Sequence, residues 1–256
     1  MDSSLMNNLF NHKIEKMKQV LIYKYGEEEG INILRGLTKH VMANIPLVEI
    51  QKFIFSYVEP KTVRRVDSFA ENMRPFEFYE EYFTSLVADP KTNLLVKRKN
   101  IVFSGTNSTG KTFTGCYLLA KAIENGNKGF YINVKELYRI YNDAHYKDDQ
   151  EAVDKYQHIV SSNFLVVDEL GKENITDSTI GFLEEFIKAR NGLNSTTIFI
   201  TNIRMQQKVQ GGRQVSEFKT RYGNSVYSSL IGYHFVEFTK EMNYRNMEGK
   251  KEYVDD

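Results

Sequence analysis

The chain has 256 residues, enough for one large domain or for a medium domain with a small companion. Hydrophobic residues make up 41% and charged residues 26%, which excludes a disordered or fibrous chain. Lysine and arginine number 34 against 33 acidic residues, giving a formal charge of +1. Any contact with nucleic acid must therefore be local, because the chain as a whole carries no basic field.

No stretch approaches the roughly 18 apolar residues of a membrane helix, and the polar N-terminus lacks the pattern of a signal peptide. We therefore expect a cytoplasmic protein without a membrane partner. Cys116 is the only cysteine, which excludes an internal disulfide and a cysteine-rich zinc module. A bound metal ion must use oxygen or imidazole ligands.

The N-terminal part of the chain differs from the rest. All four prolines fall within the first 90 residues, and the pattern changes near residue 75. Upstream, apolar residues recur at helical spacing in three segments, which predicts about three amphipathic helices. These residues are Ile14, Met17 and Leu21, then Leu34, Leu37 and Val41, then Leu47, Ile50, Ile54 and Val58. We predict a small all-α domain over residues 1–58, a linker over 59–75 and an α/β domain over 76–256.

Short apolar runs alternate with longer helical segments in the predicted α/β domain. Such alternation is typical of a parallel sheet that helices cover on both faces. The sequence predicts five strands, at Ile101–Ser104, Phe130–Val134, Phe164–Asp168, Thr197–Thr201 and Tyr233–Phe238.

Residues 105–112 read GTNSTGKT and fit the phosphate-loop pattern GxxxxGK[ST] without a mismatch. A predicted strand precedes them and a helical segment follows, which is the context that this motif needs. Backbone amides of such a loop surround phosphates, and the helix adds its positive N-terminal end. We expect Lys111 to reach the β- and γ-phosphates of ATP and the Thr112 hydroxyl to bind Mg²⁺. The predicted nucleotide contacts are Gly105, Thr106, Asn107, Ser108, Thr109, Gly110, Lys111 and Thr112.

Two later strands end in polar residues at the sheet edge where open α/β folds bind ligands. Asp168 follows an apolar run and fits the role of holding Mg²⁺, while Glu169 fits a general base for the attacking water. Asn202 follows the next apolar strand. Beside the P-loop strand, Asn202 would meet the γ-phosphate and the lytic water, as a sensor does in P-loop ATPases that have an extra strand there.

From about Phe76 onward the sequence resembles AAA+ ATPases of the DnaC/DnaI replicative helicase-loader type and their relatives, the IstB transposition ATPases. The resemblance rests on GTNSTGKT, FLVVDELGKE, TIFITN and the late segment YGNSVYSSLIGYHFVEFTKEMNYR. It implies an AAA+ P-loop ATPase domain preceded by the helical domain, with ATP and Mg²⁺ as cofactors.

The resemblance also assigns roles to arginines. Arg245 stands where the family has its sensor 2 arginine, although a solvated terminal arginine explains it too. Loaders carry a further arginine that reaches the neighbouring subunit's site, and here Ser229 occupies that position. Arg190, Arg213 or Arg221 could substitute, or hydrolysis could be slow without a partner.

Partners follow from the same resemblance. It implies that the N-terminal helices grip a hexameric replicative helicase, although a self-contained bundle or a dimerisation element would look alike. For single-stranded DNA, aromatics alternate with cations at Tyr138, Arg139, Tyr141, His145, Tyr146 and Lys147, while a helix packing face explains the same residues. The resemblance leaves open whether the protein forms a homo-oligomer.

The favoured function is an ATP-dependent loader of a replicative helicase on single-stranded DNA. One alternative is an IstB-like helper ATPase of a transposase. A basic N-terminal module would favour that alternative, but residues 1–74 hold 11 basic and 9 acidic residues, a net charge of only +2. Another is a nucleotide-gated adaptor with little turnover, which Ser229 favours. The sequence does not identify the helicase, the oligomeric state or whether the host is a bacterium or a phage.

Overall fold

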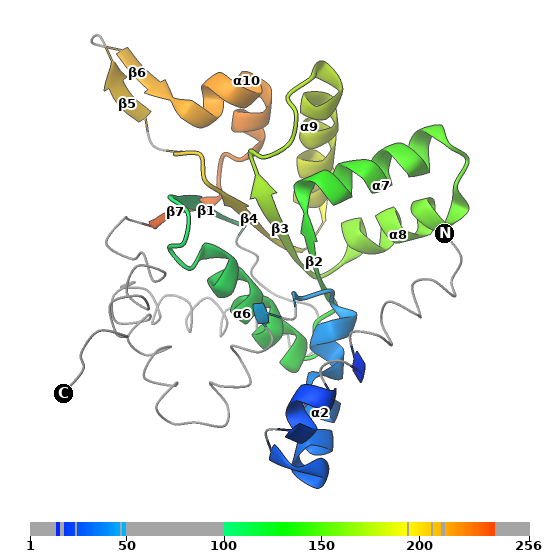
Figure 1. Ribbon diagram of the computed structural model, residues 1–256. Coiled ribbons are helices and arrows are strands. Elements are labelled where there is room, and N and C mark those ends of the chain that lie inside the picture. The colour runs from blue at the N-terminus through cyan, green and yellow to red at the C-terminus, as the bar shows by residue number, and fades with distance from the viewer. Residues whose placement is uncertain are drawn as a thin grey trace, which may run out of the picture.

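The computed structural model describes residues 14–15, 18–23, 25–46, 48–49, 100–193, 195–205, 207–210 and 213–238. The helices are α2 (Glu27–Met42), α6 (Lys111–Glu124), α7 (Val134–Tyr146), α8 (Gln150–Ser161), α9 (Asp177–Gly192) and α10 (Glu217–Ser229). The strands are β1 (Ile101–Gly105), β2 (Gly129–Asn133), β3 (Phe164–Leu170), β4 (Thr196–Thr201), β5 (Gln207–Gln210), β6 (Arg213–Ser216) and β7 (His234–Phe238). Figure 1 shows their arrangement. The predicted linker 59–75 lies outside the described residues.

A five-stranded parallel sheet of order β2-β3-β4-β1-β7 forms the centre of the fold. Each predicted strand is confirmed, with ends that differ by at most two residues. The strand β4 lies between β1, which precedes the P-loop, and β3, which carries the Asp-Glu pair. This is the extra strand that the sequence predicted, and it gives the sheet of an AAA+ P-loop ATPase.

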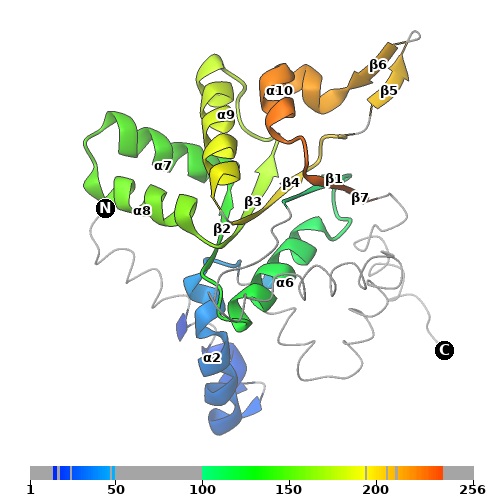
Figure 2. The same cartoon turned by 180° about the vertical axis from the view of Figure 1, so that it is seen from behind.

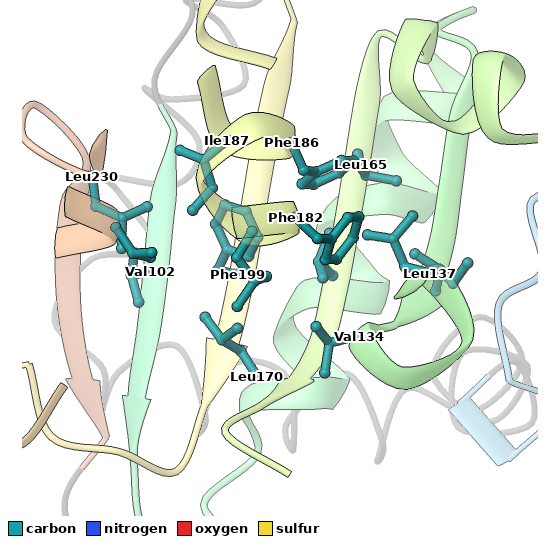
Figure 3. Close-up of a cluster of buried hydrophobic side chains, with 14 of the residues drawn as sticks. Val102, Val134, Leu137, Leu165, Leu170, Phe182, Phe186, Ile187, Phe199 and Leu230 are labelled. Carbon is teal, nitrogen blue, oxygen red and sulfur yellow. The ribbon is translucent and has the colours of Figure 1, made fainter. Parts of the chain in front are cut away.

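The buried side chains of the central strands alternate between two apolar clusters. Phe103 of β1 and Val166 of β3 lie in a cluster with α6. Val102 and Phe199 lie in the other cluster, which α7, α9 and α10 complete (Figure 3). Because both faces are covered, the strands read as nearly continuous apolar runs in the sequence.

The described N-terminal helices pack on α6, the helix that follows the P-loop. Leu37, Val41 and Ile45 share one apolar cluster with Leu118 and Leu119 of α6. Figures 1 and 2 both show α2 beside α6, on the side of the sheet away from α7 and α9. The helical periodicity at residues 18–23 and in α2 is confirmed, while the boundary between the predicted domains stays a prediction.

Sequence reasoning missed the antiparallel hairpin of β5 and β6. The hairpin projects from the body of the molecule next to α10, as Figures 1 and 2 show. Ser216 ends β6 and then caps α10, accepting a hydrogen bond from the Lys219 amide at 3.3 Å. The helix α10 is itself interrupted at Gly223, where φ is +81°.

Arg190 of α9 is fully buried at the amino-terminal side of the sheet. Its guanidinium donates to the carbonyl oxygens of Val160 and Ser162, both at 2.6 Å, and of Thr196 at 2.8 Å. It also donates to the Thr197 hydroxyl at 3.0 Å. This side chain therefore joins the end of α8 to the starts of β3 and β4.

We expect Arg190→Met to lower the free energy of unfolding by about 3–5 kcal/mol, because it leaves buried carbonyl oxygens without their donor. Lys188→Met, which removes an exposed cation paired with Glu184, should change it by less than about 1 kcal/mol. Urea titration of both variants, followed by circular dichroism, measures the difference. Equal midpoints would show that Arg190 is dispensable.

Candidate functional site

The P-loop joins the end of β1 to the start of α6. The backbone has positive φ at Gly105, Ser108 and Gly110, with values of 131°, 64° and 88°. A Cβ atom at Gly105 would collide with the Phe238 carbonyl oxygen of the neighbouring strand, so only glycine fits there. No side chain caps the first turn of α6, whose amides are therefore available to an anion.

Lys111 lies folded against the loop that it follows. Its ammonium donates to the carbonyl oxygens of Gly105 at 2.9 Å and Thr106 at 2.5 Å, and to the Thr109 hydroxyl at 3.4 Å. Burial lowers the pKa of Lys111 to about 8; the charge of Asp168 raises it in part, and Lys172 lowers it further. A bound phosphate group would raise the pKa of Lys111 again and draw the ammonium from the carbonyls.

Asp168, at the end of β3, receives two hydroxyl hydrogen bonds on one oxygen. The Thr112 hydroxyl donates to Oδ2 at 2.8 Å, and the Tyr131 hydroxyl donates to the same atom at 2.9 Å. Burial and the neighbouring Asp168 charge raise the pKa of Tyr131 above its ordinary value, so the phenol stays a donor. A hydroxyl beside a carboxylate is a donor set that suits Mg²⁺, and the residues present fit a magnesium nucleotide.

Glu169 adopts the left-handed backbone conformation, with φ +63°, directly after Asp168. Such a conformation costs a non-glycine residue about 1 kcal/mol or more, and it coincides with a shift of the β3–β4 register between Val167 and Leu170. The Glu169 amide donates to Asp168 Oδ1 at 2.6 Å. Its carboxylate pairs with Lys172 at 2.5 Å, and both side chains are substantially exposed. An exposed pair is worth about 1 kcal/mol or less, so the carboxylate can exchange Lys172 for water.

Asn202 follows β4 at the same edge of the sheet and is exposed. The adjoining Thr201 ties β4 to β3, since its hydroxyl donates to the Leu170 carbonyl at 2.6 Å and accepts from the Ile203 amide at 3.0 Å. Asn202 therefore has a fixed place next to β1, although no contact tests its predicted sensor role. Arg245, the other predicted sensor, lies outside the described residues.

Three arginines were considered as replacements for the arginine that helicase loaders carry at the position of Ser229. Two of them have other partners. Arg190 is fully buried, which contradicts the possibility that it reaches a neighbouring subunit's site. Arg221 donates to the carbonyl oxygens of Gly171 at 2.7 Å and Glu173 at 3.1 Å, within its own chain. The side chain of Arg213 is not among those described. Ser229 is the last residue of α10, and its hydroxyl donates a hydrogen bond to the Ser225 carbonyl oxygen at 3.1 Å.

The aromatic residues of α7 divide into two groups. Tyr138 and Tyr141 pack on Phe182, with ring centroids 5.2 and 4.7 Å away. Because these two rings pack within the protein, they are not available for stacking on DNA bases. Tyr146 is 72% exposed. Arg139 and Lys147 both pair with Asp143, at 3.4 and 2.7 Å. Tyr146 is the tyrosine of this predicted set that is most open to a base.

Sequence reasoning also missed the polar contacts behind the Asp-Glu pair. Glu173 accepts from the Gly171 amide at 2.9 Å and receives the Tyr222 hydroxyl, while Arg221 holds the same loop from α10. Tyr131 gave no signal because it lies 37 residues before Asp168 in an ordinary strand. No cluster of three metal-ligating His, Cys, Asp or Glu residues occurs in the part of the chain that the structure describes.

A model of the IstB-like ATP binding protein family matches residues 73–211, which include the P-loop, the Asp-Glu strand and the β4 strand. The chain belongs to this family. Membership and the sheet order together identify an ATP-binding AAA+ P-loop domain. No curated protein matches the chain. None of the described helices is long and apolar enough to cross a membrane.

Several solved structures have a similar fold. The DnaC helicase loader is 24% identical, with 55% of this chain and 78% of that chain covered and a TM-score of 0.45. DnaI is 19% identical, with 65% and 84% covered and a TM-score of 0.49. The initiator DnaA bound to AMPPCP and single-stranded DNA is 17% identical, with 71% of this chain but 51% of that chain covered and a TM-score of 0.49. Such distant likenesses carry no inference about activity.

The lowered pKa of Lys111 predicts a pH dependence of nucleotide binding. Below about pH 8 the ammonium is already charged, whereas above it binding must take up a proton, because bound phosphates raise the pKa of Lys111. We expect the affinity for ATP to fall by up to about tenfold per pH unit above pH 8.

Titration calorimetry between pH 7.5 and 9.5, in buffers of different ionisation enthalpy, measures both the affinity and the proton uptake. Lys121→Met is the matched control, because Lys121 lies on the same helix and pairs with Glu124 away from the loop. It should keep the parent's dependence. A flat profile for the parent protein would show that Lys111 does not titrate in this range.

Proposed function

We propose that this protein is a Mg²⁺-dependent ATPase that loads or remodels a replicative hexameric helicase on single-stranded DNA. The observation that carries the ATPase is the 2.8 Å hydrogen bond between the Thr112 hydroxyl of the P-loop and the Asp168 carboxylate of β3. Those two oxygens, with the Lys111 ammonium nearby, form the donor set that a magnesium triphosphate requires.

Each residue at the site has a proposed role toward the magnesium nucleotide or the attacking water. Mg²⁺ would be held by the Thr112 oxygen and, through water, by Asp168, where it neutralises charge on the phosphate oxygens. Lys111 donates to the β- and γ-phosphates. Glu169 accepts a proton from the attacking water, and Asn202 hydrogen-bonds that water and the γ-phosphate. Arg245 is proposed as a further contact to the nucleotide.

Hydrolysis by the isolated protein is proposed to be slow. A serine occupies position 229, and Arg190 and Arg221 are engaged within the chain. An arginine supplied by a neighbour typically contributes a factor of about 10³–10⁵ in turnover. Without such a charge the protein would hold ATP until a partner supplies or assembles one, as the nucleotide-gated adaptor considered as an alternative would also do.

Three variants separate binding from turnover. We expect Lys111→Ala to weaken ATP binding, because it removes the cation at the phosphates, and Glu169→Gln to bind normally while abolishing turnover. Ser229→Arg should raise the slow rate of the parent. Phosphate release and binding of labelled ATP measure these effects, alone and with helicase plus single-stranded DNA. Tight ATP binding by Lys111→Ala would contradict the P-loop assignment. Fast turnover by the dilute parent protein would contradict the proposal that the isolated protein lacks an activating arginine.

The helicase-binding part of the proposal rests on the N-terminal helices. Val20 is 45% and Tyr23 93% exposed, although both are large apolar or aromatic residues. The opposite side of the same segment is buried, with Leu21 in the cluster against α6. A helix that is anchored on one side and apolar on the other suits a protein partner. Because the anchor is α6, the partner would contact the helix that follows the P-loop.

We expect the double variant Val20→Ser, Tyr23→Ser to lose capture of the helicase while ATP binding stays intact. Tyr146→Ser is the matched control, since it removes an exposed tyrosine on α7 instead. It should keep helicase capture and weaken binding of single-stranded DNA, where stacking contributes about 1–3 kcal/mol per base. Pull-downs with the full chain and filter binding of DNA measure the two outcomes. Capture of helicase by the double variant at parental affinity would contradict the assignment.

A second candidate is an accessory ATPase for a transposase, which the match to the IstB-like family favours. The same pull-down distinguishes the two, because a transposase rather than a hexameric helicase would be recovered. Residues 1–74 carry a net charge of only +2, so their composition offers little support for a DNA-binding N-terminal module. This charge balance is the reason for preferring the helicase loader.

A further inference from the structure

Tyr131 connects the N-terminal helices to the candidate magnesium site. It lies in β2, which is an edge strand of the five-stranded sheet. On the open side of β2, the Tyr131 amide donates to the Ala43 carbonyl at 2.9 Å. The Asn44 side chain in turn donates to the Tyr131 carbonyl at 2.9 Å. Both backbone groups of Tyr131 are therefore held by the turn that ends α2.

The side chain of the same residue reaches the site. Its hydroxyl donates to Asp168 Oδ2 at 2.9 Å, next to the hydroxyl of Thr112 on the same oxygen. The Tyr131 ring packs against the apolar cluster shared by α2 and α6. One residue thus has its backbone fixed by the N-terminal segment, its ring in the shared core and its hydroxyl on the carboxylate.

The segment that holds Tyr131 is itself anchored. Ala43 and Ile45 are buried in the cluster that contains Leu119 of α6. His40, near the end of α2, lies with Nε2 3.7 Å from a Glu124 carboxylate oxygen at the end of α6. The position of α2 on α6 therefore determines where Ala43 and Asn44 meet β2.

A carboxylate that serves a metal ion needs a fixed orientation. The Thr112 oxygen could offer a lone pair to Mg²⁺ while its O–H still donates to Asp168, and the Tyr131 hydroxyl is a second donor that holds the same carboxylate oxygen. Removing a hydrogen bond of this kind to a metal-binding carboxylate typically lowers the metal affinity or the activity by 10–100-fold.

We propose that Tyr131 is a positioning residue that orients Asp168 toward the Mg²⁺ of the bound nucleotide, and that the N-terminal helices set its place through Ala43 and Asn44. The inference rests on the proposed ATPase function. The docking of the N-terminal helices, where a partner is proposed to bind, then controls how much Mg²⁺ the nucleotide site requires.

The test measures binding of a fluorescent ATP analogue to the full chain as a function of Mg²⁺ concentration. For Tyr131→Phe we expect the half-saturating Mg²⁺ concentration to rise by about tenfold or more, with Mg²⁺-free binding unchanged. Tyr141→Phe is the matched control, because it removes a hydroxyl that donates to Glu185 at 3.0 Å outside the site. It should behave as the parent protein.

A second pair tests the N-terminal part. Asn44→Ala should raise the half-saturating Mg²⁺ concentration in the same direction but by less. Asn127→Ala, which removes an amide donor to the Ala122 carbonyl at 3.0 Å, should not. A parental Mg²⁺ dependence in Tyr131→Phe would overturn the positioning role, and one in Asn44→Ala would overturn the connection to α2. Failure of the parent to bind the analogue at any Mg²⁺ concentration would overturn the proposed function itself, and this inference with it.

Discussion

The hydrogen bond between Thr112 and Asp168 depends on a shared register across three strands. Ile198 of β4 pairs with Ile101 of β1 on one side and with Val166 of β3 on the other. Because the strands are parallel and level, the ends of β1 and β3 meet at one edge although β4 separates them. A slip of one residue would turn every side chain of a strand to the opposite face and remove the site.

Polar side chains at the opposite edge hold that register. Arg190 binds the carbonyl oxygens that precede β3 and begin β4. Asn100, just before β1, accepts from the Thr197 amide at 2.8 Å through its side chain and from the His234 amide at 2.8 Å through its carbonyl. The four strands β3, β4, β1 and β7 are therefore aligned where they begin, and the functional residues lie where they end.

The sequence predicts the parts of this molecule whose signal is local. An apolar run between turns identifies a strand, and the P-loop pattern identifies eight contiguous residues together with their flanking elements. The rest depends on contacts between distant positions. Tyr131 alternates like any strand residue, and nothing near it in the sequence indicates Asp168 or Asn44. Arg221 lies near Ser229 along the chain, but its position in the sequence does not reveal that it already donates to the Gly171 carbonyl. The hairpin of β5 and β6 contains few apolar residues, so periodicity did not mark it.

The coupling between α2 and the site has a physical limit. The contacts of Ala43 and Asn44 to Tyr131 are between neutral groups, worth about 1 kcal/mol each, while the bond from Tyr131 to the Asp168 carboxylate is worth about 1.5–3 kcal/mol. The two neutral bonds together are worth about 2 kcal/mol, so the coupling through them can be no larger than a factor of about 30. Such coupling is reciprocal. If a partner changes the affinity of the protein for magnesium nucleotide by some factor, the bound nucleotide changes the affinity for that partner by the same factor.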